Sequence, residues 1–415
     1  MERRWVDVCS AIRIKFSMSA SEIEKTGAPD RGQVPLWRDP AKRAMVFQVV
    51  ALGLVFMLSY WIFSNTQANL RKLNITTGFG FFSKEAGFEI GESLIPYSAA
   101  DTYARALLVG FLNTLKVATT GVLLTVILGV FVGISRLSKN WLLARLATGY
   151  IEVLQNIPVL LQLFFWYGLF HTSLPGPRQS CSPVPGIFFN NRGFYFPLPA
   201  YHPAYPAMAV ALLAACGACY FLHRWARARQ DKTGKIFPVL PVSLAGIIGL
   251  PLICWLAFGM PTRLHVPHLV GFNYEGGFSF SPEFGALLFG LVLYTSAFVA
   301  EIVRAGIQAV SKGQTEGAMS LGLKPGQVLS LVILPQALRV IIPPLTSQML
   351  NLTKNSSLAV AIGYPDFVAV TNTTINQTGQ AIEGVAMIMT VYLVISLVTS
   401  AFMNWYNKRT ALVER

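Results

Sequence analysis

Long runs of apolar residues recur along this chain, and each is close to the length that crosses a lipid bilayer. A membrane-spanning α-helix needs about 20 predominantly apolar residues. We identify eight such spans from the hydrophobic pattern. They cover residues 44–63, 107–134, 146–171, 204–222, 237–258, 284–303, 340–363 and 385–404. The pattern predicts an all-α integral membrane protein with about eight transmembrane helices.

The composition supports this class. Of the 415 residues, 53% are hydrophobic and only 13% are charged, whereas soluble domains contain roughly 25% charged residues. Too little polar surface remains to cover a water-soluble body of this size. The span at 340–363 is the least regular of the eight, because two prolines and several polar residues interrupt it.

The basic residues indicate an orientation. The segments between spans form two alternating sets, one with 24 Lys and Arg residues and the other with seven. The richer set comprises residues 1–43, 135–145, 223–236, 304–339 and 405–415. Because positive charge accumulates on the cytoplasmic side during insertion, we predict that both termini are cytoplasmic, with 1–43 as a retained N-terminal segment and 405–415 as a tail. The net charge of +14 is then a topology signal and gives no support for nucleic-acid binding.

The segment 316–335, EGAMSLGLKPGQVLSLVILP, is too polar for its apolar surroundings. Gly322 can end a short helix in the left-handed region. Pro325 can occupy the first turn of a second helix, where its missing N–H costs nothing, and we expect that helix to continue until Pro335. The residues alone also allow an amphipathic helix lying on the membrane surface.

The same segment resembles the EAA loop of permeases from ATP-binding-cassette importers, a Glu-Ala-Ala pattern followed by Gly and then Ile-x-Leu-Pro. Two positions depart from the pattern, Gly317 and Val332, and both are small or apolar exchanges. The matching residues are Glu316, Ala318, Gly322, Leu334 and Pro335. The resemblance implies a type I importer permease fold in which this loop is a coupling helix that docks on a separate ATP-hydrolysing subunit.

We expect ATP to bind to that partner subunit, and we expect no cofactor on this chain. A phosphate-binding loop requires G-x-x-x-x-G-K-[ST], and the sequence contains no such motif. Its one Gly-Lys pair, Gly234-Lys235, is followed by Ile236. We therefore expect that the chain is not itself an enzyme.

Two further blocks are similar to permeases for polar amino acids, the histidine-permease-like family. Residues 296–323 form one block, and residues 110–140 with 150–168 match the first half of the same domain. Over nearly its full length, the chain resembles the Q-type permease subunits of bacterial general L-amino acid importers. The likeness implies a permease domain at 107–404 with an inserted helix pair at about 204–258, preceded by an extra helix and periplasmic loop at 44–106.

The resemblance also implies partners and a location. The partners would be an ATP-binding subunit, a second permease subunit and a periplasmic amino-acid-binding protein, in addition to the surrounding lipid bilayer. The protein would be a multi-pass component of the bacterial inner membrane.

Ionisable residues within spans are costly and are functional suspects. Glu301 and Arg304 are three residues apart, so we expect an ion pair on one helix face. Glu152 lies near the end of its span, where pairing with Lys139 or Arg145 is the structural expectation. For Lys116 the structural expectation is snorkelling toward the interface.

Lys354 belongs to the polar stretch NLTKNSS. A zwitterionic amino acid needs polar partners to cross a bilayer, and irregular backbone is tolerated beside a water-filled path. The candidate residues of a translocation path are Asn113, Asn351, Lys354, Asn355 and Ser356. The alternative is a polar helix packed against the partner permease.

Two other functions account for the sequence less well. An ion-coupled secondary amino acid transporter would need no partner motor, but it gives no reason for the segment 316–335. A membrane-embedded enzyme would need a constellation such as H-E-x-x-H, and the five histidines are scattered. Cys216 and Cys219 form a C-x-x-C within an apolar run, where small residues packed inside a membrane helix are a better interpretation than a metal site.

Overall fold

The structure is a computed structural model that describes residues 40–72, 77–234 and 237–410. It contains two compact units, one ending at Thr76 and the other beginning at Thr77. The described part of the first unit is the helix α2 (Pro40–Lys72), which contains the predicted span 44–63. Most of the predicted segment 1–43 and the end of the tail 405–415 lie outside the described residues.

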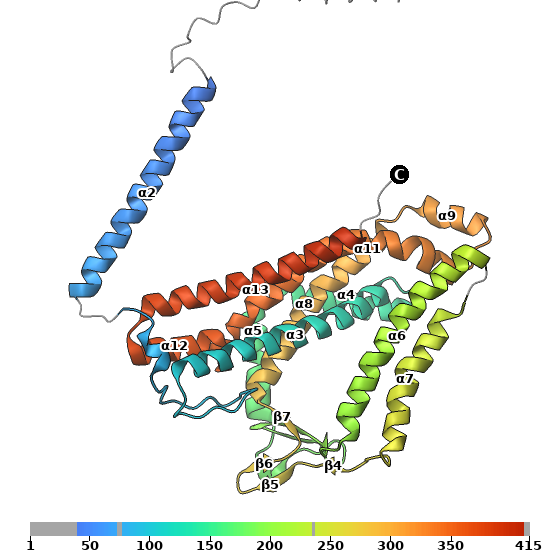
Figure 1. Ribbon diagram of the computed structural model, residues 1–415, viewed down its shortest axis with the longest axis horizontal. Coiled ribbons are helices and arrows are strands. Elements are labelled where there is room, and N and C mark those ends of the chain that lie inside the picture. Colours follow the sequence, from blue (N-terminus) through green and yellow to red (C-terminus); the bar gives the residue numbers. More distant parts are fainter. Residues whose placement is uncertain (1–39, 73–76, 235–236, 411–415) are drawn as a thin grey trace, which may run out of the picture. The chain divides into compact units, whose positions relative to one another are not determined.

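The second unit is mainly helical (Figure 1). Its long helices are α3 (Tyr103–Arg136), α6 (Ala204–Thr233), α7 (Val239–Ala257), α8 (Pro282–Gln308), α11 (Leu334–Asn355) and α13 (Ala381–Thr410). Its shorter helices are α4 (Trp141–Asn156), α5 (Val159–Ser173), α9 (Lys312–Ser320), α10 (Pro325–Gln327) and α12 (Phe367–Thr378). Short 3-10 helices are η1 (Gly80–Ser83), η2 (Pro177–Gln179) and η4 (Ser356–Ile362), and η3 (Val328–Ile333) is a π-helix.

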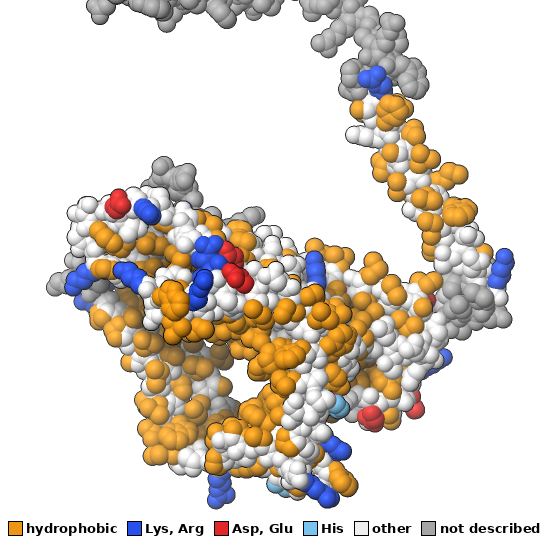
Figure 2. Space-filling view, turned by 180° about the vertical axis from the view of Figure 1, so that it is seen from behind, with side chains coloured by type: hydrophobic (Ala, Val, Ile, Leu, Met, Phe, Trp, Pro, Cys, Tyr) orange, Lys and Arg blue, Asp and Glu red, His pale blue; other side chains and the backbone are white. Residues whose placement is uncertain are grey.

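Among the described residues, seven helices are long and apolar enough to cross a membrane, and one bent pair raises the number to eight. This confirms the predicted fold class. Hydrophobic side chains cover much of the face seen in Figure 2, and many charged side chains lie toward its edges. The short helix α12 was missed, because its 12 residues do not make a span.

The predicted span 146–171 is wrong as a single helix. It is a pair, α4 and α5, bent by 104°. Ile157 has extended backbone, with φ −101° and ψ 126°, because a residue before proline is pushed away from the helical region, and Pro158 follows it. The Gln162 side-chain amide then donates to the carbonyl oxygens of Leu154 at 2.9 Å and Ile157 at 3.0 Å, so the break is held by specific hydrogen bonds.

Helix α8 lies at the centre of the second unit and packs against α3, α4, α5 and α11. Glycines on α3 permit the close approach. A Cβ atom on Gly133 would lie 2.7 Å from the Ala300 carbonyl oxygen, and one on Gly129 would lie 2.5 Å from Val299 Cγ1. Small residues at such contacts let the backbones of membrane helices approach each other.

Short antiparallel strands flank the helices α6 and α7 in the sequence. One sheet has the order β1 (Phe188–Asn190), β2 (Gly193–Phe196) and β7 (Phe278–Phe280). The two others pair β3 (Leu198–Pro199) with β4 (Leu264–His265), and β5 (His268–Val270) with β6 (Asn273–Glu275). The sequence pattern does not predict these strands, because runs of two to four residues show no clear alternation. Helices α6 and α7 pack on each other, and the Cys219 thiol lies 3.6 Å from the Ser243 carbonyl oxygen.

The segment 77–102 folds onto the bundle. Phe81 and Ala86 are buried together with Tyr103 of α3 and with Phe367 and Val370 of α12. This segment, which was predicted as part of the 44–106 region, therefore forms one packed body with α3 and α12.

Candidate functional sites

The hairpin predicted for residues 316–335 is present. Its first arm is α9, which begins earlier than predicted, at Lys312, so the hairpin comprises residues 312–335. Gly322 has a φ of +79° directly after the helix. Its N–H donates to the Met319 carbonyl at 2.9 Å, and the Leu323 N–H donates to the Ala318 carbonyl at 3.3 Å. These two bonds form a Schellman motif, the usual helix end that requires a left-handed residue.

The second arm begins as predicted and ends differently. Pro325 is the first residue of α10, and the Gln327 side-chain oxygen accepts from the Lys324 N–H at 2.9 Å. The expected end at Pro335 is wrong, because the chain passes through η3 into α11 without a break. In a π turn the hydrogen bonds reach one residue further back, so the proline that follows does not stop the helical path.

The hairpin has a buried inner side and an exposed tip. Ala318 and Val328 are buried where α9 packs against η3. At the tip, Glu316 is exposed, the Met319 side chain is 51% exposed and the Leu321 side chain is 84% exposed. The tip therefore presents an apolar surface beside a carboxylate.

The residues that match the EAA-loop pattern lie on both arms of the hairpin. Glu316, Ala318 and Gly322 lie on α9 and its cap, whereas Leu334 and Pro335 begin α11. The base of the second arm remains beside α9, since the Gln336 side-chain nitrogen lies 3.5 Å from Gln314 Oε1. The structure thus brings the two parts of the pattern into one hairpin.

Charged side chains link α3 and α8 near the root of the hairpin. The predicted Glu301–Arg304 pair is present, and Arg136 of α3 binds the same carboxylate. The sequence pattern does not indicate Arg136 as a partner, because it lies 165 residues from Glu301. The expected pairing of Glu152 is not seen: its side chain is exposed and forms no ion pair with Lys139 or Arg145.

Lys354 lies at the end of α11 and lines a pocket of about 540 Å³. Ser357, Tyr392 and Ser396 line the same pocket with apolar residues of α12 and α13. The Lys354 ammonium group forms no hydrogen bond or ion pair with any described residue. Lys354 is thus the one cationic side chain among the described residues that line this pocket.

The other four predicted path residues are not among the residues that line this pocket. Asn351 is exposed and Asn355 is half-buried. Ser356 is buried, and its hydroxyl donates to the Thr353 carbonyl at 2.7 Å. Asn113 lies elsewhere, fully buried, with its amide donating to the carbonyl oxygens of Glu92 at 2.8 Å and Pro365 at 2.9 Å.

Lys116 does not snorkel. Its ammonium group forms an ion pair with Glu92, and the two side chains are only 14% and 12% exposed. The same ammonium lies 4.2 Å from the centre of the Phe284 ring. The snorkelling expectation is wrong because the partner comes from the folded 77–102 segment, which the sequence pattern did not place near α3.

Asp366 is a buried acid that sequence analysis did not single out, although an Asp before a helix is a capping signal. It is the N-cap of α12, accepting from the Ala369 N–H at 2.8 Å and from the Tyr392 hydroxyl at 3.1 Å. It lies outside the candidate spans, and burial raises the pKa of its carboxyl group to about 6. Through Tyr392, the cap of α12 is connected to the pocket that Lys354 lines.

The family described as "Binding-protein-dependent transport system inner membrane component" matches residues 235–412. The chain is 50% identical, over 91% of its length and 94% of the relative, to the general L-amino acid transport system permease protein AapQ of Rhizobium johnstonii. The chain belongs to this family of transport-system permeases.

This permease is also 41% identical to the glutamate/glutamine/aspartate/asparagine transport system permease protein BztB of Rhodobacter capsulatus, over 91% of this chain and 96% of the relative. The predicted family resemblance and the inner-membrane location are confirmed. Membership also assigns the broad role, that of a membrane permease component of a transport system.

Proposed function

We propose that this permease is a transmembrane subunit of an ATP-driven importer of L-amino acids, coupled to a separate ATP-binding subunit through the hairpin 312–335. The observation that carries the proposal is the hairpin itself, whose two arms pack on each other and whose tip exposes apolar side chains beside Glu316. The relatives support the cargo class, since their names specify L-amino acids and the glutamate group.

The tip has the chemistry of a docking element. Met319 and Leu321 can fill an apolar groove on the partner, and Glu316 can offer a charge-assisted hydrogen bond to a basic residue there. With both termini on the cytoplasmic side, the hairpin faces the cytoplasm. The complete importer would contain a second permease subunit, ATP-binding subunits and a periplasmic amino-acid-binding protein.

The pocket at Lys354 is proposed as part of the translocation path. An unpaired ammonium group can hold the carboxylate of a zwitterion, while Asn351, Asn355 and Ser356 supply hydrogen-bonding groups around it. A moving substrate needs such partners because an unpaired charge is expensive away from water. Asn113 would contribute at the other end of the path.

The decisive experiment measures uptake of labelled L-amino acids by cells that carry the whole transporter. A Cβ atom at Gly322 meets no other atom within 4 Å, so substitutions there test backbone conformation. Gly322→Val should lower uptake by about tenfold, since a left-handed position costs about 1–2 kcal/mol for such a residue. Gly322→Asn is the matched control, because Asn tolerates this conformation.

Uptake should also stop when ATP is depleted and should persist with a protonophore at constant ATP. Normal transport by Gly322→Val, at equal amounts in the membrane, would refute coupling through the hairpin. Uptake that follows the proton gradient would instead support the secondary transporter.

A further inference from the structure

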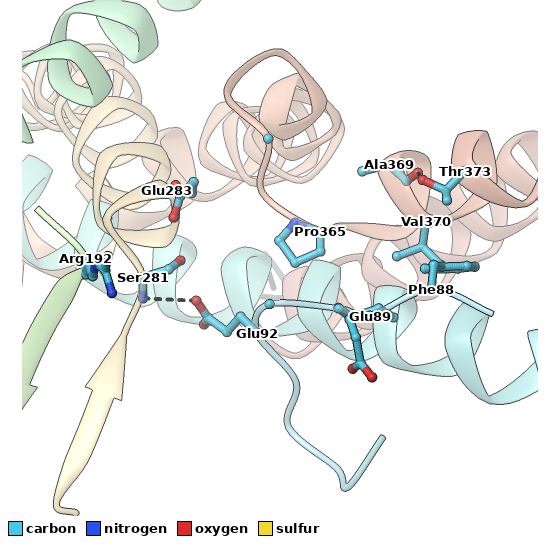
Figure 3. Close-up of a pocket in the computed structure, with 13 residues that line it drawn as sticks. Phe88, Glu89, Glu92, Arg192, Ser281, Glu283, Pro365, Ala369, Val370 and Thr373 are labelled. Atoms are coloured by element: carbon cyan, nitrogen blue, oxygen red, sulfur yellow. Dashed lines mark hydrogen bonds between the residues drawn. The ribbon is translucent and has the colours of Figure 1, made fainter. Parts of the chain in front are cut away.

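A second pocket, of about 500 Å³, lies where α8 begins. Helix α8 has 27 residues, so this end is about 40 Å from the end that leads to the hairpin. Four parts of the fold line the pocket: the loop 88–92, the β1–β2 turn, the start of α8, and the segment from Gly363 into α12 (Figure 3). A volume of this size is typical of small-molecule sites.

Two of the carboxylates at this pocket already have partners. Glu92 forms the ion pair with Lys116, and its second oxygen accepts from the Ser281 N–H at 3.1 Å, the dashed line in Figure 3. Glu89 accepts from the Ala99 N–H at 3.2 Å. These bonds hold the loop 88–92 in place and so shape the wall of the pocket.

Two opposite charges at the pocket remain available. The Glu283 carboxylate forms no hydrogen bond or ion pair with any described residue. Arg192 uses one nitrogen on the Phe272 carbonyl at 3.0 Å and keeps its other N–H donors. Both line the pocket without pairing with each other, and in Figure 3 they are drawn on the side opposite Ala369, Val370 and Thr373.

We propose that this pocket is a subsite for the zwitterionic head group of a free α-amino acid, at the face predicted to be periplasmic. Arg192 binds the α-carboxylate, for which its planar donors are suited, and Glu283 binds the α-ammonium group. The far wall, formed by Phe88 and Val370, contacts the side chain of the ligand. The helix dipole alone would account for an acid in the first turn of α8, but it does not account for Arg192 at the same pocket. The inference rests on the proposed amino acid cargo.

The test uses the full chain in lipid nanodiscs without a binding protein or nucleotide, with L-glutamine as the probe and saturation-transfer NMR as the readout. Arg192→Gln and Glu283→Gln should each weaken binding at least tenfold. Arg178→Gln and Glu275→Gln remove charges from the same region outside the pocket and should leave binding unchanged. Glutaramate, which lacks the ammonium group, and 4-aminobutanamide, which lacks the carboxylate, should compete poorly.

A third variant blocks the pocket while leaving its charges intact. A Cβ atom at Gly91 meets nothing within 4 Å and the residue has no positive φ, so Gly91→Leu should fold and abolish binding. The subsite is overturned if all three pocket variants bind the probe as tightly as the wild type. It is also overturned if the wild type does not bind the probe at about 10 mM. ATP-driven uptake by the complete transporter is measured in parallel: its absence in the wild type refutes the proposed function, whereas intact uptake without binding refutes only the subsite.

Discussion

The Asp366 carboxyl group is buried between α12 and α13, and each of its oxygens accepts a hydrogen bond. One bond caps a helix and the other joins that helix to the next through Tyr392. Burial nevertheless disfavours the charged form, which is why its pKa rises to about 6 from 3.8. A single side chain therefore makes the α12 region sensitive to pH.

The sign follows from proton binding. Between about pH 4 and pH 6 the folded chain keeps a proton that the unfolded chain has lost, so this acid favours the folded state at low pH and the contribution is lost as the pH rises, by up to about 3 kcal/mol. Asp366→Asn cannot titrate and should escape the loss. The melting temperature of the variant minus that of the wild type, measured in detergent, should therefore be larger at pH 7 than at pH 4.5. A constant difference would contradict the raised pKa.

At the scale of the element, apolar composition and local residue spacing predicted the helices and their local ion pair. Contacts between segments distant in the sequence were not predicted. The spans follow from apolar length, and the Glu301–Arg304 pair follows from helical spacing. The 104° bend was missed because apolar residues continue on both sides of Pro158. The partners Arg136 and Glu92 lie on other segments, and no local pattern specifies such contacts.

The hairpin shows the same limit. Gly322 and Pro325 specified the turn, since each has a conformational preference of its own. Pro335 was misread as a helix end because the preceding π turn depends on how the whole path packs. In the candidate path, the pocket at Lys354 includes Tyr392 and Ser396, which belong to a span that otherwise looks like ordinary membrane helix.

Close packing between α3 and α8 gives a second prediction. In Gly133→Ala the new methyl group would meet the Ala300 carbonyl oxygen at 2.7 Å, and backbone cannot rotate away as a side chain can. The helices must separate, at a cost of about 1–3 kcal/mol, so the melting temperature should fall. Gly149→Ala on α4 meets nothing within 4 Å and should be neutral or slightly stabilising. Equal melting temperatures for the two variants would rule out the tight contact.

At the scale of the whole molecule, the segment 77–102 links the first half of α3 to the starts of α8 and α12. Glu92 reaches Lys116 of α3 and the Ser281 N–H before α8, and its carbonyl accepts from Asn113. The Asn113 amide also reaches Pro365, just before α12. One loop therefore fixes how this end of the bundle is assembled.

The stability lost when the Lys116–Glu92 ion pair is broken should depend on which charges remain. Lys116→Met leaves a mostly buried carboxylate without its cation, which is strongly destabilising, by about 3–5 kcal/mol for a fully buried pair. The double variant Lys116→Met with Glu92→Gln removes both charges and should recover most of the stability. Thermal unfolding and protease cleavage within 77–102 measure the two effects. A double variant less stable than Lys116→Met would show that the pair is not coupled.

The continuous helical path from Pro325 to Ile362 has a mechanical consequence. Its 38 residues extend over about 55 Å, with the hairpin tip near one end and Lys354 near the other. A tilt of this helical path by about 10° about its middle would move its two ends by about 5 Å in opposite directions. A displacement of the hairpin tip would thus move Lys354 sideways, without any backbone hydrogen bond along the helical path having to break.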